Sequence, residues 1–212
     1  MPETTNPLPD AVDPAGEPHE LPDLRPQARL VASLAAGVLD GQLDGPTPCP
    51  DYAVRHLLGH VVGLAVAFTD AGRKELGATT DTDPSATLPD IDDDWRDALP
   101  RRLAELAEVW RDSAAWNGPT RAGGVDLPGE LAGVIALNEL VVHGWDLARA
   151  TGQEYAPDAA SLAVSHGMLA AAATESPEAR GTLFGPPVPV PPGAPLLDQI
   201  IALSGRDPLW HA

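Results

Sequence analysis

The chain has 212 residues, enough for one domain with a sizeable core, and 43% of them are hydrophobic. Only nine residues are Phe, Trp or Tyr, so the core must consist mainly of Leu, Val and Ala, which favours closely packed helices. The formal net charge of −18 repels nucleic acid and anionic lipid surfaces. No apolar run reaches the roughly 18 residues of a membrane span, so neither nucleic acid nor a membrane is an expected partner.

The N-terminal sequence and the cysteine content both indicate a cytoplasmic protein. The N-terminus lacks the charged and apolar regions of a signal peptide. Cys49 is the only cysteine, which excludes an intrachain disulfide and a cysteine-cluster metal site. Cys49 lies between two prolines in TPCPDY, where a small buried or turn residue is favoured over a nucleophile.

The first part of the chain divides into a tail and two helices. Residues 1–22 are rich in proline and acidic residues, which predicts a disordered tail, and residues 23–212 are expected to form a single domain. Apolar residues recur at three- and four-residue steps from Leu24, which predicts a first helix that ends before Gly41. A turn restricted by prolines follows, and a second helix is expected over 52–74.

Two further long helices and a C-terminal extension are predicted. The third helix should span 92–116 and be kinked or divided at Pro100, and a sharp, irregular loop should lead to a fourth helix over 130–150. From about residue 153 an extension begins, with short helices over 159–174 and 195–204. Between them the run FGPPVPVPPGAP predicts an extended strap across the bundle.

The stretch NELVVHGWDLARATG carries the residues best suited to chemistry. Its Glu139, His143 and Asp146 follow one another at steps of four and three, so they share one stripe of the fourth helix among apolar neighbours. A buried carboxylate needs a partner, and a divalent cation satisfies Glu139 and His143 together. His60, on the inward side of the second helix, is the natural third ligand, which gives two nitrogens and one carboxylate.

Several other interpretations of these residues stay open. His60 could be a hydrogen-bonded core histidine, and Glu139 with His143 could be an ordinary i,i+4 pair. His56, one turn before His60, is a competing ligand but is expected in solvent beside Arg55. Asp146 could be a fourth ligand, orient His143, act as a base, or pair with Arg149 on the surface. The remaining histidines, His19, His166 and His211, are expected in solvent or in packing roles.

Three stretches together resemble a known family. They are TPCPDYAVRHLLGHVVG at the second helix, NELVVHGWDLARATG at the fourth, and FGPPVPVPPGAPLLDQIIALSGRDP near the C-terminus. Their order and spacing resemble the DinB-like superfamily, in the branch of the N-terminal domain of mycothiol-dependent maleylpyruvate isomerase. Tyr52 stands where that branch usually has tryptophan, and the residues after the fourth helix do not suggest the isomerase's additional C-terminal domain.

The resemblance implies a fold, a metal site and a reaction class. The fold would be all-α, a four-helix up-down-down-up bundle, and the family's metal ligands fall on His60, Glu139 and His143. The cofactor would be one divalent ion, with zinc first and nickel, iron or manganese as alternatives. A small thiol such as mycothiol would then attack an electrophilic substrate in an isomerase or S-transferase reaction. Metal-dependent hydrolysis and a non-catalytic metal-binding or ligand-sensing bundle are the alternatives, and the chain could be a monomer or a homodimer.

Overall fold

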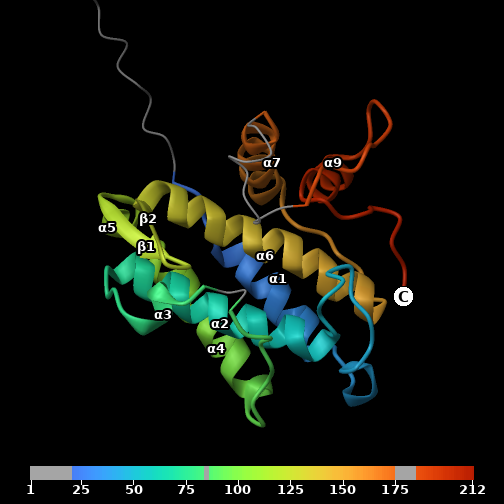
Figure 1. Cartoon of the computed structure of the whole chain (residues 1–212), viewed down its shortest axis with the longest axis horizontal. Helices are drawn as coiled ribbons and strands as arrows, with labels where there is room; N and C mark the ends of the chain where they lie inside the picture. The colour runs from blue at the N-terminus through green and yellow to red at the C-terminus, as the bar shows by residue number, and fades with distance from the viewer. Residues whose placement is uncertain (1–20, 84–85, 175–184) are drawn as a thin grey trace, which may run out of the picture.

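Four long helices make up the main body of the chain. The computed structural model describes residues 21–83, 86–174 and 185–212, and Figure 1 shows their arrangement. The long helices are α1 (Arg25–Ala36), α2 (Val54–Arg73), α4 (Trp95–Val109) and α6 (Gly129–Thr151). Both α1 and α2 pack against both α4 and α6. The predicted all-α class is confirmed, whereas the up-down-down-up order of the helices stays a prediction.

The helices follow from apolar spacing and from clear stop signals. Buried residues of α2 recur at steps of three and four, and they enter one continuous core with those of α1, α4 and α6. The backbone turns left-handed at the end of α2, where Lys74 has φ 63°, and at the end of α6, where Gly152 has φ 68°. The predicted bounds of the second and fourth helices are therefore nearly those observed.

The third helix was predicted too long. It ends at Val109, and a separate short helix α5 (Ser113–Trp116) follows because the Asp112 side chain accepts the Ala114 N–H at 2.9 Å and starts a new turn. The indole of Trp116 then folds back to donate to the carbonyl of Trp110 at 2.8 Å. Pro100 does not divide the helix, which continues through it.

The loop predicted as irregular before α6 is a β-hairpin. Strands β1 (Pro119–Ala122) and β2 (Val125–Pro128) pair antiparallel across Gly123 and Gly124, whose φ values are 59° and 77°. A tight two-residue hairpin turn of this type requires positive φ angles at both residues, and glycine adopts such angles most easily. Thr120 donates to the carbonyl of Ala71 at 2.6 Å, which joins the hairpin to the end of α2.

The C-terminal extension lies outside the four long helices. Helix α7 (Ala159–Ala173) packs on α6, and α9 (Leu196–Leu203) packs on α7, as Figure 1 shows. Both lie where predicted. The described part of the proline-rich strap runs along α9, where Val188 N–H donates to the carbonyl of Ala202 at 2.9 Å. The predicted tail lies outside the described residues except for its last two.

Short elements fill the remaining connections. A 3-10 turn, η1 (Asp40–Gln42), follows α1, and a short helix, α3 (Ala78–Asp81), follows α2. Within the described residues α6 alone is long and apolar enough to cross a membrane by length and composition, but 78% of its most apolar window is buried inside the structure. The core helix of a soluble protein has the same character.

Gly59 of α2 lets the backbone of Asp90 approach the helix. A Cβ added at Gly59 would lie 2.5 Å from the carbonyl oxygen and 2.6 Å from the carbonyl carbon of Asp90. We expect Gly59→Ala to lower the free energy of unfolding by about 1–3 kcal/mol, because backbone must move. Gly63→Ala, one turn later with nothing within 4 Å, should instead raise it by about 0.5–1 kcal/mol. Urea denaturation of both variants tests this, and equal shifts would contradict the close approach.

Candidate metal centre

The structure brings together the three side chains predicted as ligands. His60 comes from α2, and Glu139 and His143 come from α6, whose middle packs against α2. One donor atom from each residue lies within 4.8 Å of the others. Glu139 Oε2 lies 3.4 Å from His60 Nε2 and 3.2 Å from His143 Nε2, and the two imidazole rings stand edge to face with centroids 4.7 Å apart.

The three groups are largely shielded from solvent, and their environment sets their charges. The side chains are 13%, 23% and 9% exposed for His60, Glu139 and His143. Burial alone would raise the pKa of Glu139, but hydrogen bonds from both histidines outweigh it and hold the pKa well below its usual range. Burial lowers the pKa of His60. Glu139 is therefore an ionised carboxylate beside a neutral His60.

Asp146 lies on the far side of the His143 ring. Its Oδ2 is 2.9 Å from His143 Nδ1, and its side chain is fully buried. Burial opposes a charge on His143, but the hydrogen bonds that its ring donates to Asp146 and Glu139 prevail and raise the pKa of His143 to about 9. Each ring nitrogen of His143 thus faces one carboxylate, and this fixes the orientation of the ring.

The surface pairing of Asp146 with Arg149 is wrong. Asp146 is paired instead with Arg206, whose Nε lies 2.7 Å from Oδ1 and 3.0 Å from Oδ2. Arg149 donates to the carbonyl of Pro208 at 2.8 Å and lies over the ring of Trp145. The surface pair is one of several interpretations that the sequence leaves open because Arg149 is near Asp146 in sequence, whereas the partner found in the structure lies 60 residues away.

The other histidines of the described residues do not join the three. His56 Nδ1 accepts the backbone N–H of Ala53 at 3.1 Å and so caps the start of α2. His166 is half-buried on α7, and His211 is exposed. His19 lies outside the described residues.

The sequence alone missed three residues near the centre. Arg206 was quoted only as part of the C-terminal stretch SGRDP, and its role depends on a fold that returns this segment to α6. Tyr52 packs its ring 5.6 Å from that of His60. Burial raises the pKa of the Cys49 thiol, and the charges of Arg206 and Asp146 also act on it, so the turn of Cys49 lies close to the centre.

The raised pKa of Cys49 predicts an unreactive thiol. Because the thiol stays protonated at neutral pH, iodoacetamide should alkylate the folded chain more slowly than it alkylates free cysteine, and the rate should rise about tenfold per pH unit below the pKa. Mass spectrometry of timed samples measures this rate. The urea-unfolded chain is the control and should react like free cysteine. A folded rate at or above that of free cysteine at neutral pH would contradict the prediction.

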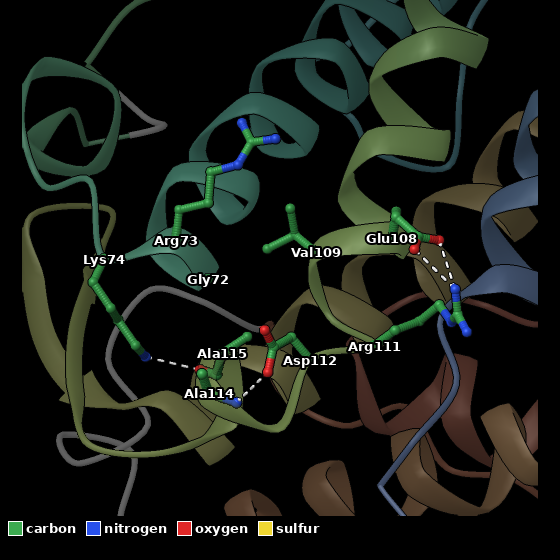
Figure 2. Close-up of a pocket in the computed structure, with 9 residues that line it drawn as sticks. All are labelled: Gly72, Arg73, Lys74, Glu108, Val109, Arg111, Asp112, Ala114 and Ala115. Atoms are coloured by element: carbon green, nitrogen blue, oxygen red, sulfur yellow. Dashed lines mark hydrogen bonds and ion pairs between the residues drawn. The ribbon is translucent and has the colours of Figure 1, made fainter.

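A separate surface pocket lies at the other end of α2. Figure 2 shows it lined by the end of α2, the end of α4 and α5, with Lys74 Nζ donating to the carbonyl of Ala115 at 2.8 Å and Arg111 paired with Glu108 at 2.8 Å. Arg73 is paired with Glu105 at 2.9 Å. Gly72 is twelve residues from His60, about 18 Å along the helix at 1.5 Å per residue. The pocket therefore has no part in the metal centre.

Comparisons with known proteins agree with this architecture. The mycothiol maleylpyruvate isomerase N-terminal domain family matches residues 24–148, more than half of the chain and all three candidate ligands. The crystal structure of the mycothiol-dependent maleylpyruvate isomerase superposes with a TM-score of 0.53 at 17% identity, covering 69% of this chain and 66% of that chain. A histidine-to-alanine mutant of that isomerase gives the same TM-score at 16% identity. No curated protein sequence matches.

These two solved structures share the fold with this chain, and the match spans just under two thirds of the isomerase's length. The family match covers both helices that carry the candidate ligands, α2 and α6 up to Ala148. The resemblance seen in the sequence is thereby confirmed, and the chain belongs to the mycothiol maleylpyruvate isomerase N-terminal domain family.

Proposed function

We propose that the chain binds one divalent metal ion through His60, Glu139 and His143 and uses it to activate a small thiol, such as mycothiol, toward an electrophilic substrate. The observation that carries the proposal is the set of three donor atoms from two helices within 4.8 Å of one another. Membership of the family supports the thiol. The reaction is an isomerisation or an S-transfer, carried out in the cytoplasm.

The donor set fits such an ion. Two imidazoles and one carboxylate are the ligands of many catalytic zinc sites, which leave a further position open. Zinc is our first choice, and nickel or iron would accept the same donors. Glu139 is already ionised, so its carboxylate needs no deprotonation before it coordinates a cation. His143, whose pKa is raised to about 9, would release the proton on Nε2 when the ion binds. The low exposure of both histidines restricts water around the centre.

The chemistry divides between the ion and the chain. A divalent ion lowers the pKa of a thiol that coordinates it, so the thiolate is present at neutral pH. The chain supplies the fixed geometry: Asp146 accepts a hydrogen bond from His143 Nδ1, which directs Nε2 of the same ring toward Glu139. Tyr52 packs against the ring of His60 and limits its rotation.

The burial and the hydrogen bonds of Asp146 disfavour hydrolysis at this centre. A hydrolase needs a base that reaches the attacking water, whereas Asp146 is fully buried and both its oxygens bond to His143 and Arg206. Asp146 is therefore better suited to orient His143 than to act as a base, and this favours thiol chemistry over metal-dependent hydrolysis.

The test combines metal analysis with thiol-dependent turnover. The purified full chain is loaded with zinc, nickel or ferrous iron, its metal content is measured, and a panel of small electrophiles is assayed with and without mycothiol. We expect one ion per chain and turnover only when ion and thiol are both present. Ester or amide cleavage without thiol would instead support a hydrolase. Metal binding without turnover on any substrate, with a large loss of Tm on removal of the ion, would support a structural metal.

A further inference from the structure

In the segment after α9, Arg206 contacts Asp146 in the C-terminal half of α6. Arg206 Nε donates to both oxygens of Asp146, at 2.7 Å and 3.0 Å, and Nη1 contacts the carbonyl and hydroxyl oxygens of Ser204 at 3.4 Å and 3.3 Å. The Arg206 side chain is 14% exposed and that of Asp146 is fully buried. A charge-assisted contact of this kind between buried groups is both strong and directional.

A specific turn fixes where Arg206 lies. Helix α9 ends with Gly205 at φ 88°, and the N–H groups of Gly205 and Arg206 donate to the carbonyls of Ala202 and Ile201, both at 3.1 Å. This is the glycine-dependent Schellman ending of a helix. A Cβ at Gly205 would lie 2.7 Å from the Cα of Gly185, so the proline-rich strap lies directly against the turn. The backbone around Arg206 is thus held by α9 and by the strap.

The contacts of Arg206 lead through Asp146 to a candidate ligand. Asp146 Oδ2 faces His143 Nδ1 at 2.9 Å, and the other ring nitrogen faces Glu139 Oε2 at 3.2 Å. Without Arg206, Asp146 would be a fully buried carboxylate with His143 as its remaining hydrogen-bond partner. Because a buried carboxylate that loses a partner is costly, Asp146 would turn or draw water inward, and its hold on the His143 ring would weaken.

We propose that Arg206 is a positioning residue of the metal centre: by holding Asp146 in place, it fixes the His143 ring in the orientation that coordinates the ion. The inference rests on the proposed metal site. It makes the C-terminal segment part of that centre, although α2 and α6 supply every ligand. Arg206 acts through Asp146 and needs no contact with the ion itself.

A simpler role is that Arg206 only attaches the C-terminal segment to α6, and Arg149 provides the matched control for it. Arg149 also lies on the contact between α6 and this segment, since its Nη2 donates to the carbonyl of Pro208 at 2.8 Å. It makes no hydrogen bond or ion pair with His60, Glu139, His143 or Asp146 among the contacts of the described residues. Loss of either arginine removes one attachment, but only the loss of Arg206 should alter the metal centre.

The test measures cobalt(II) binding to full-length wild type, Arg206→Met, Arg206→Lys and Arg149→Met. Affinity comes from chelator competition, the coordination geometry from the visible absorption of the bound cobalt, and stability from Tm. We expect Arg206→Met to weaken binding by about 10–100-fold and to shift the absorption bands. Arg206→Lys keeps the charge and should recover part of both. Arg149→Met should lose Tm but keep the wild-type affinity and spectrum.

Three outcomes would overturn the proposal. Arg206→Met could bind cobalt with the affinity and spectrum of wild type, or Arg149→Met could alter both as much as Arg206→Met does, which would leave attachment as the only role. Wild type that binds no cobalt would overturn the metal site itself, and the role of Arg206 with it. If Arg206→Met does not fold, Arg206→Lys provides the test. A wild-type cobalt affinity and spectrum in Arg206→Lys would show that the contact of Arg206 with both oxygens of Asp146 is not needed, and this would overturn the proposal.

Discussion

Replacing His60 with Ala is expected to weaken zinc binding by more than about a hundredfold. Loss of a group that only orients a ligand costs about 10–100-fold in affinity, and loss of a ligand should exceed that range. His60 is the candidate ligand on α2, so without it both remaining candidate donors would come from one helix. Competition with a chromogenic chelator measures the affinity, and Tm measured without metal shows whether the variant still folds.

His56→Ala is the matched control because His56 lies one turn earlier on the same helix. Its ring accepts the N–H of Ala53 at 3.1 Å, so its loss should cost about 1 kcal/mol of stability, as the loss of a helix cap does. Zinc affinity should stay at the wild-type value. Equal weakening in both variants, or weakening in His56→Ala alone, would contradict the assignment of His60 and reopen the competition between the two histidines.

The three candidate ligands could be chosen from the sequence because helical spacing is a local property. Glu139, His143 and Asp146 fall on one stripe of any straight helix, and the apolar residues around them indicate that the stripe faces inward. His60 followed from the same periodicity on α2. The structure places these donors as that periodicity suggested. The spacing alone does not require an ion, because an ionised Glu139 between two histidines is also satisfied by its contacts with them.

Arg206 could not be found in this way because its role depends on contacts between distant parts of the chain. Nothing in SGRDP indicates that the end of α9 lies against the C-terminal half of α6. The neighbouring Arg149 offered an apparent partner for Asp146, yet on α6 it points to Pro208 and Trp145. Sequence spacing therefore predicted which candidate ligands lie together but not the groups that hold them.

The errors in the fold also have local physical causes. The apolar pattern of the third helix continues to Trp116, so periodicity alone did not reveal the break; the cap at Asp112 did. The hairpin was missed because its strands have four residues each and no regular alternation. Gly123 and Gly124 were the sequence signal for the hairpin, because two consecutive positive φ angles favour glycine.

Two tryptophans, Trp110 and Trp116, pack against α6 on the side toward α4 and α5. Of the predicted substitutions, loss of the Trp110 ring should lower the free energy of unfolding most. Trp110 is 1% exposed, its Nε1 donates to the carbonyl of Phe68 at 3.0 Å, and its ring meets that of Trp116 edge to face at 5.0 Å. A Cβ at Gly133 would lie 2.7 Å from Trp110 and 2.5 Å from Trp116, so α6 rests directly on both rings. We expect Trp110→Ala to lower the free energy of unfolding by about 3–5 kcal/mol.

Trp110→Phe tests the contribution of the indole hydrogen bond separately from that of the aromatic ring. It keeps most of the apolar contact and removes the hydrogen bond from the indole to the Phe68 carbonyl, so the loss should be about 1–2 kcal/mol. Urea denaturation followed by far-ultraviolet circular dichroism measures both variants without depending on tryptophan fluorescence. His143 lies ten residues beyond Gly133, about 15 Å along α6, so folded Trp110→Phe should bind zinc as wild type does. A tenfold weaker affinity in that variant would mean that the tryptophan pair positions the ligands as well as stabilising the helix.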